Sequence, residues 1–267
     1  MRKRTQALEA TDGDEGNHGI DSLRRGMEVL RCFQPGENAL TVAEIARRLD
    51  LPRTTARRLL NTLAAHDFLS GVPDRDAFRL HVASFVLGQA VLSGSELVRS
   101  ATPVLQWLAN RHALHCLLCV RDRGDMLVLA HQAGAGTAHC PLGAGTRLPI
   151  ARTAPGHAWL WTQPVATQGE WLTPMRASAN PAEHTHAAAI YQAFHDLVQG
   201  GACASFGTWR SGVGFIAAPV ALAGGDSAVI AGVHTCAAPQ ERSRIERECT
   251  PALLQAAGTI RREIRRV

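Results

Sequence analysis

Apolar and polar positions between Thr41 and Leu69 recur with the period of two short amphipathic helices joined by a tight turn. The first helix is predicted to begin at Thr41, because Thr41 and Glu44 have the spacing of a capping box. The second is predicted over residues 52–66, where Pro52 suits the first helical position. Its apolar stripe consists of residues three or four positions apart: Ala56, Leu59, Leu60 and Leu63.

The opposite face of the second helix is polar and has no acidic residue. Such a helix fits the DNA major groove, where arginine binds guanine, asparagine binds adenine and threonine contacts a thymine methyl group or a phosphate. Leu51 cannot cap the helix, which leaves backbone amides for a phosphate. A solvated arginine-rich face is the alternative interpretation of the helix alone. The candidate DNA-binding residues are Thr41, Arg53, Thr54, Thr55, Arg57, Arg58, Asn61 and Arg75.

Flanking segments extend this pair of helices into a winged helix-turn-helix. An apolar stripe after Asp21 or Ser22, both good N-caps, predicts a preceding helix that covers the pair. Residues 67–80 have the pattern of a β-hairpin. We therefore assign residues 19–81 to a winged helix-turn-helix DNA-binding domain and residues 1–18 to a disordered arm.

The pattern changes after this domain. Residues 82–95 form an amphipathic segment that ends in Ser-Gly-Ser, which predicts a linker helix and a domain boundary. Beyond it, strands and helices mix without strict alternation, which predicts an α+β domain around an antiparallel sheet over residues 96–267. A helix over 96–111 should break or bend at Pro103. Further helices are expected at 155–161, near Glu170, at 183–198 and at 241–266, and strands at 114–121, 125–131, 148–150, 202–206, 213–220 and 228–235.

Composition permits this interpretation without requiring it. A length of 267 residues favours two domains over one, and a net charge of +5 is compatible with a nucleic-acid partner. No apolar run follows the basic N-terminus, and no stretch approaches the roughly eighteen apolar residues of a membrane span. We therefore expect a cytoplasmic protein without a membrane partner.

The chain carries few signs of metal or catalytic chemistry. Its seven cysteines are scattered, unlike those of a disulfide scaffold. Cys116 and Cys119 form a lone CxxC in a predicted strand, where their odd separation places them on opposite faces. The nucleophile-elbow, HExxH, P-loop and Rossmann patterns do not occur. We expect no metal, no cofactor and no enzyme activity.

Five blocks, in this order and spacing, resemble the IclR family of bacterial transcriptional regulators: GIDSLRRGMEVLRCF, LTVAEIARRLDLPRTTARRLLNTL, FRL, GTRLPIARTAPGHAWL and GFIAAPV. The resemblance implies a winged helix-turn-helix, a linker helix and a GAF-like effector-binding and oligomerisation domain, assembled as a dimer or tetramer. Within the family, the chain looks most similar to members that control the breakdown of aromatic acids such as hydroxyphenylpropionates. Asp50 and Asp67 occupy positions where this family usually has a turn glycine, and aspartate tolerates the left-handed region better than most residues.

The resemblance places an effector site beside the helix that begins near Thr153. Free amides at that helix N-terminus would favour a carboxylate, and Arg152 or His157 would add positive charge. Aromatic side chains would line the remainder, so a small organic acid with an aromatic or alkyl body is expected. In the alternative interpretation, aromatic side chains fill the cavity and the domain only oligomerises. The candidate effector-binding residues are Arg152, Thr153, Ala154, Gly156, His157, Trp209, Phe215 and Thr235.

Together these features predict a ligand-responsive, sequence-specific regulator that binds a double-stranded DNA operator as a homodimer or homotetramer. Effector binding would shift the effector domains, and the linker helices would then change the spacing of two recognition helices. A ligand-independent DNA-binding and oligomerising protein with a filled effector pocket is the alternative.

Overall fold

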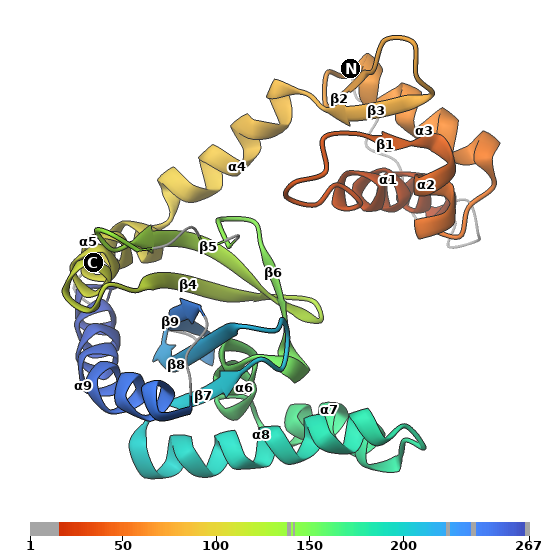
Figure 1. The fold of residues 1–267 in the computed structure, drawn as a ribbon. Coiled ribbons are helices and arrows are strands. Elements are labelled where there is room, and N and C mark those ends of the chain that lie inside the picture. Colours follow the sequence, from red (N-terminus) through yellow and green to blue (C-terminus); the bar gives the residue numbers. More distant parts are fainter. Residues whose placement is uncertain (1–15, 138–139, 141, 223–224, 236–238, 265–267) are drawn as a thin grey trace, which may run out of the picture. The chain divides into compact units, whose positions relative to one another are not determined.

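The computed structural model describes residues 16–264 except 138–139, 141, 223–224 and 236–238 (Figure 1). The chain divides into two compact units, residues 1–90 and residues 91–267. Each unit has its own buried core, so the local sequence patterns can be followed separately in each.

The first unit is a winged helix-turn-helix, as predicted. Its three strands form an antiparallel sheet in the order β1-β3-β2, in which the unpredicted strand β1 pairs with the hairpin. The core contains predicted apolar positions of α2 and α3, including Ile45 and Leu60. For α1 the predicted stripe of Leu23, Met27, Leu30 and Phe33 is only partly right: Leu30 and Phe33 pack against the core, but Leu23 and Met27 are exposed and Val29 is buried instead, because the helix turns a different side toward α2 and α3. The elements are α1 (Gly16–Arg31), β1 (Leu40–Thr41), α2 (Val42–Arg48), α3 (Arg53–Ala65), β2 (Leu69–Gly71), β3 (Ala77–Leu80) and α4 (Val82–Gly94), which continues into the second unit.

Helix α1 begins earlier than expected. It starts at Gly16, not at Asp21 or Ser22, so residues 16–18 of the predicted disordered arm are helical. The Asp21 carboxylate pairs with Arg24 and Arg25 one turn further along, at 2.5 and 2.8 Å. These pairs place Asp21 within the helix instead of capping it. The rest of the predicted arm, residues 1–15, lies outside the described residues.

The two turns that flank α3, the predicted recognition helix, confirm the expectation for their aspartates. Asp50 and Asp67 adopt the left-handed conformation, with φ of 51° and 60°. The next residue in each turn, Leu51 or Phe68, donates its amide to a carbonyl five positions earlier, at 2.9 and 3.0 Å. This is the hydrogen bond of a Schellman motif, in which the left-handed residue ends the helix.

The second unit is an α+β domain around an antiparallel sheet, as predicted. The strand order is β6-β5-β4-β9-β8-β7, and every neighbouring pair is antiparallel. Its elements are α5 (Glu96–His112), β4 (His115–Asp122), β5 (Asp125–Ala133), β6 (Arg147–Pro149), η1 (Ile150–Arg152), α6 (Ala154–Trp161), α7 (Val165–Ala177), α8 (Pro181–Gly200), β7 (Cys203–Phe206), β8 (Val213–Ala221), β9 (Ser227–Thr235) and α9 (Pro239–Ile264).

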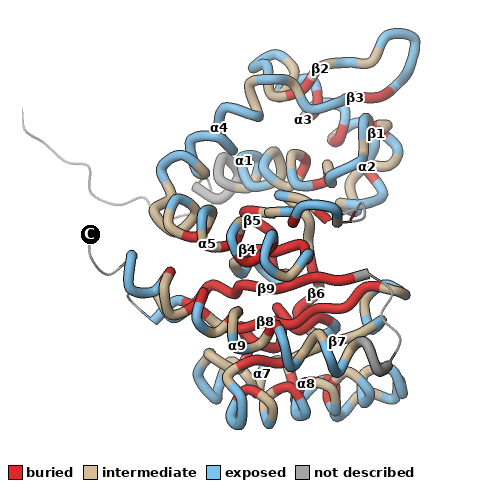
Figure 2. The backbone as a smooth tube through the Cα atoms, turned by 60° about the vertical axis from the view of Figure 1, so that its left-hand side comes forward, coloured by how far each residue is buried: buried red, intermediate tan, exposed pale blue. Residues whose placement is uncertain are grey.

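Helices cover both faces of this sheet, whose central strands are almost entirely buried (Figure 2). Helices α6, α7 and α8 share a hydrophobic cluster with one face, and α5 and α9 share a second cluster with the other. Cys119 belongs to the first cluster and Cys116 to the second, which confirms that they point to opposite faces. Burial raises the pKa of Cys116 to about 12, so this thiol stays protonated near neutral pH.

Helix α5 runs through Pro103 without the break that the sequence suggested. Proline removes one backbone hydrogen bond. Burial of Ala101, Leu105 and Leu108 on the same helix offsets this loss. None of the described helices is both long and apolar enough to cross a bilayer.

Candidate nucleic-acid interface and effector face

The polar face of α3 is open to solvent. Ala56 and Leu60 on the opposite face are completely buried, so the helix is fixed in rotation about its own axis. Among the described residues, the side chains of Arg58 and Asn61 have no intramolecular hydrogen-bonding partner. Thr55 is half-buried at the edge of this face. The exposed members are Arg53, Thr54, Arg57, Arg58 and Asn61.

The N-terminus of α3 is uncapped, as expected, but the helix begins at Arg53, one residue later than predicted. Pro52 occupies the N-cap position and its side chain makes no capping hydrogen bond. The first backbone amides of α3 are therefore not capped by a side chain. They lie beside Arg53 and Thr54, where they could bind a phosphate.

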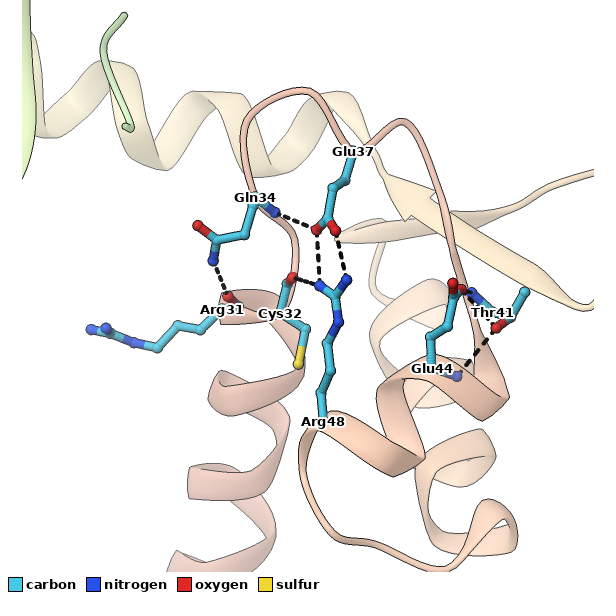
Figure 3. A network of polar contacts seen from close by, with 7 residues as sticks. All are labelled: Arg31, Cys32, Gln34, Glu37, Thr41, Glu44 and Arg48. Carbon is cyan, nitrogen blue, oxygen red and sulfur yellow. Dashed lines mark hydrogen bonds and ion pairs between the residues drawn. The ribbon is translucent and has the colours of Figure 1, made fainter. Parts of the chain in front are cut away.

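Helix α2 begins with the predicted capping box (Figure 3). The Thr41 amide donates to the Glu44 carboxylate at 2.8 Å, and the Glu44 amide donates to the Thr41 hydroxyl at 3.2 Å. The Thr41 hydroxyl also donates to Glu44 at 2.7 Å. Its only proton is thus engaged, which leaves Thr41 less suited to a DNA phosphate than the residues of α3.

A second network in Figure 3 joins α2 to the end of α1. The Arg48 guanidinium binds both carboxylate oxygens of Glu37, at 2.9 and 2.6 Å, and the Cys32 carbonyl at 2.7 Å. The Gln34 amide donates to the same carboxylate at 3.1 Å. The Arg48 hydrogen bonds, together with this amide, lower the pKa of Glu37 to about 2.

The wing places an acid beside the recognition helix. Asp76, at the end of the hairpin turn, accepts a hydrogen bond of 2.6 Å from Nη2 of Arg57. Sequence reasoning missed this contact, because nothing in the local pattern relates two residues 19 positions apart. Arg75 is exposed in the same turn, as expected for a residue that meets DNA.

In the second unit, the N-terminus of α6 differs from expectation. The Ala154 amide donates to the Ser205 hydroxyl at 2.8 Å, and the Gly156 amide donates to the Thr153 hydroxyl at 3.3 Å. Pro155 has no amide proton. The expectation of free amides for a carboxylate is therefore wrong, because Ser205, from strand β7, and the helix's own N-cap residue satisfy them.

His157 is not the positive group that we expected. It is 1% exposed and its Nε2 donates to the Ala151 carbonyl at 3.0 Å. Burial lowers its pKa below 6.5, so the ring is neutral near pH 7. Gly156 has a packing role, because a Cβ atom there would lie 2.3 Å from the Ile150 backbone.

Arg152 and the aromatic candidates do lie close together. Arg152 donates to the Thr208 carbonyl at 2.9 Å and to the Trp209 carbonyl at 3.2 Å, which ties η1 to the loop before β8. The Trp209 ring lies 6.1 Å from that of Phe215, which is 1% exposed. Thr235 is opposite Val213 in the sheet, but its side chain lies outside the described residues.

A histidine pair shares this face of the sheet. His115 is opposite Val233, which is opposite Phe215, so all three side chains point to the same side. His115 Nδ1 lies 3.0 Å from His131 Nε2. Burial and the neighbouring His115 lower the pKa of His131. No sequence motif marks this pair, because only the pairing of β4 with β5 brings the rings together.

Comparison with known proteins gives a consistent result for both units. Residues 22–73 match the IclR helix-turn-helix domain, and residues 89–264 match the C-terminal domain described as bacterial transcriptional regulator IclR. The Pca regulon regulatory protein of Pseudomonas putida is 27% identical over 240 residues, which are 89% of this chain and 82% of that protein.

Solved structures give the same picture. An IclR family transcriptional regulator from Brucella abortus superposes with a TM-score of 0.81 at 28% identity, over 95% of each chain. An IclR homologue from Microbacterium hydrocarbonoxydans, solved in complex with 4-hydroxybenzoate, has a TM-score of 0.70 at 22% identity, over 92% of this chain and 100% of that one. At that identity the second likeness concerns the fold alone.

Proposed function

Because the chain belongs to the IclR family of bacterial transcriptional regulators, we propose that it is a ligand-responsive, sequence-specific regulator whose effector is a small aromatic acid. It acts on double-stranded operator DNA, which in bacteria places it in the cytoplasm. The observation that carries the DNA-binding part is the exposed, acid-free face of α3 opposite an apolar stripe in which Ala56 and Leu60 are fully buried.

Recognition rests on three kinds of group on this surface. Arg57, Arg58 and Asn61 have the side chains that bind guanine and adenine edges in the major groove. The uncapped N-terminus of α3 and the exposed Arg53 suit the phosphate backbone, which positions the helix without selecting a sequence. Arg75 in the wing turn would extend the phosphate contacts beyond α3.

The active assembly is a homodimer or a dimer of dimers, held in part by the first unit. Helix α4 has no buried residue and exposes Phe85, Val86 and Val91. A groove of about 700 Å³ between α1, α3 and α4 is lined mainly by apolar side chains, among them Leu23 and Met27. A second copy that covers these surfaces would place two recognition helices on two half-sites, about one helical turn apart or a multiple of it.

The effector proposal rests on the arginine and aromatic groups of the second unit. Nε and Nη2 of Arg152 bind the Thr208 and Trp209 carbonyls, whereas Nη1 binds neither of them. Nη1 could therefore donate to a carboxylate, with which arginine pairs well. Trp209, whose carbonyl Arg152 binds, and the neighbouring Phe215 offer an aromatic face beside it. 4-Hydroxybenzoate, with which the Microbacterium homologue of the same fold was solved, is an acid of this chemistry and serves as the probe.

Selection from randomised duplexes tests the DNA-binding part. The full-length chain should enrich one motif with two related half-sites, and its affinity should exceed that for unrelated duplex by about a thousand-fold or more. Enrichment of no motif, with a steep dependence on salt, would instead indicate an architectural DNA-binding protein.

A thermal-shift comparison tests the effector part. 4-Hydroxybenzoate should raise the unfolding temperature, because a ligand that binds only the folded state stabilises it. The matched neutral probe, 4-hydroxybenzamide, should not. The same acid should then change the affinity of the protein for the selected duplex. This requires that the acid binds the DNA-bound and the DNA-free state of the protein with different affinities.

One observation favours a second candidate, a ligand-independent regulator. The amides of α6 are already bonded, His157 is neutral and Phe215 is buried, so the groups expected to bind a carboxylate are partly occupied by the chain itself. In that case the second unit only oligomerises, and no aromatic or aliphatic acid shifts the unfolding temperature.

A further inference from the structure

The acid next to the recognition helix has no evident structural task. Asp76 and Arg57 both have more than half of their side-chain surface exposed, at 58% and 51%. Ion pairs this exposed contribute little to stability, because water screens them and both side chains lose freedom. The Arg57–Asp76 pair therefore contributes little to holding the β2–β3 hairpin, the wing, against α3, which points to another role.

The Asp76 backbone is held firmly. Its carbonyl accepts the Val42 amide at 3.2 Å, and the next residue, Ala77, pairs with Thr41 in the sheet. The carboxylate thus starts from a fixed point beside α2 and α3. Arg57, in contrast, stands on the outer face of α3 and lines the same shallow hollow as Arg58 and Asn61.

The geometry leaves Arg57 able to bind a second partner. Among the residues that the structure describes, the Asp76 carboxylate accepts one hydrogen bond, from Nη2 of Arg57, whereas a guanidinium has five N–H groups. Arginine loses considerable side-chain freedom when it is immobilised, and its planar fork recognises guanine only in one orientation. A carboxylate that holds the fork beforehand reduces this entropic cost at binding.

The same carboxylate has an unfavourable effect on unspecific binding. A negative charge near the DNA backbone opposes the phosphates, so it weakens binding to every sequence. The carboxylate improves recognition only if the arginine that it orients gains more binding free energy at the correct base pair than the negative charge costs on DNA in general.

We propose that Asp76 is a positioning residue for DNA recognition: it holds Arg57 so that the guanidinium reaches a guanine edge, and it raises sequence selectivity at the expense of unspecific affinity. This inference rests on the proposed DNA-binding function. Arg57 is the residue that touches the base, and Asp76 acts through it.

Selection from randomised duplexes, performed with variants of the full-length chain, tests this proposal. Arg57→Ala should abolish the base preference at one position of each half-site, and Asp76→Ala should weaken it at the same position. For a guanine contact the full preference is roughly five- to 150-fold. On duplex without the motif, Asp76→Ala should bind more tightly than the wild type.

Asp74→Asn is the matched control. It removes one negative charge from the same turn, and asparagine tolerates the positive φ of 58° at this position. It should increase unspecific affinity as Asp76→Ala does, but leave the motif unchanged. Because Arg57 is the one side-chain partner of Asp76 within the described part of the chain, circular dichroism of Asp76→Ala should match that of the wild type.

Three outcomes would overturn the proposal. If Asp76→Ala leaves the motif intact while Arg57→Ala alters it, Asp76 does not position Arg57. If Asp74→Asn loses as much base preference as Asp76→Ala, the effect comes from the removed negative charge and not from positioning of Arg57. If Arg57→Ala selects the same motif as the wild type, Arg57 does not contact a base. If the wild type enriches no motif, the proposed function fails as well, so the two failures can be told apart.

Discussion

A single guanidinium joins two helices and the loop between them in the DNA-binding unit. Arg48 binds the Glu37 carboxylate and the Cys32 carbonyl, so α2 is tied to the end of α1. Since the pKa of Glu37 falls from 4.5 to about 2 in the folded chain, the folded state favours the charged carboxylate. This contribution to stability is present above pH 4.5 and is lost as the pH falls toward 2.

Glu37→Gln should therefore destabilise the first unit at pH 7 by about 1 kcal/mol, because the neutral amide keeps its shape but loses the ion pair. The difference from the wild type should shrink as the pH falls below 4.5. Hydrogen exchange over residues 29–49 measures this effect, whereas tryptophan fluorescence would not, since all five tryptophans lie beyond residue 100.

The control for this experiment is Asp50→Asn, which removes an exposed acid from the same unit at a position where asparagine suits the positive φ. Its hydrogen exchange should match that of the wild type both at pH 7 and below pH 4.5. A Glu37→Gln chain with the same protection as the wild type at pH 7 would show that the Arg48 network contributes nothing to stability.

At the scale of elements, α6 is buried along almost its whole length in the second unit. All residues from Ala154 to Leu160 are buried, and close contact with η1 leaves no space for a side chain at Gly156. The helix is thus a structural centre whose first turn is bonded to the sheet through Ser205.

Gly156→Ala should cost about 3 kcal/mol or more, because the added methyl group would overlap backbone atoms of Ile150 that cannot rotate away. Thermal unfolding followed by tryptophan fluorescence measures it. Gly169→Ala in α7 is the matched control, since nothing lies within 4 Å of its Cβ position. That control should stabilise by about 1 kcal/mol through helix propensity. Equal stability of both variants would refute the close packing of α6 on η1.

Elements with a repeating local pattern could be predicted from the sequence. The apolar stripe of α3 and the Thr41–Glu44 capping box are encoded within a few residues, and both occur as predicted. The antiparallel sheet of the second unit followed from strands that do not alternate strictly with helices. In these cases the neighbours in sequence decide the structure.

Features that depend on distant neighbours could not be predicted. The amide of Ala154 is satisfied by Ser205, 51 residues away, and strand β1 has two residues and exists only because β3 lies beside it. For the same reason, helix polarity alone suggested free amides at α6, and proline alone suggested a break in α5. Tertiary contacts decide both.

At the scale of the whole molecule, the proposed binding to two half-sites requires more than one copy of the chain. Phe85 in α4 is 62% exposed, and Leu23 and Met27 of α1 are exposed as well. Patches of this kind mark protein-protein interfaces when they are contiguous. A dimer would also explain how effector binding reaches the DNA, since it would change the spacing of two recognition helices.

Phe85→Asp should shift the chain toward monomers or smaller assemblies in sedimentation velocity and should weaken binding to the selected duplex, because one half-site then binds alone. Val165→Asp is the control, since Val165 in α7 is apolar and 84% exposed but outside the proposed interface. An unchanged assembly in Phe85→Asp would exclude the α4 surface from it.

The central claim is that the polar face of α3 contacts base pairs, and Arg58 tests it most directly because its side chain is exposed and unpaired among the described residues. The measurement is the dissociation constant of Arg58→Ala on the duplex selected by the wild type, with Arg176→Ala, an exposed arginine of α7, as the control. The account predicts a loss of about 1–3 kcal/mol for Arg58→Ala and no change for the control. Equal affinity of Arg58→Ala and the wild type would contradict it.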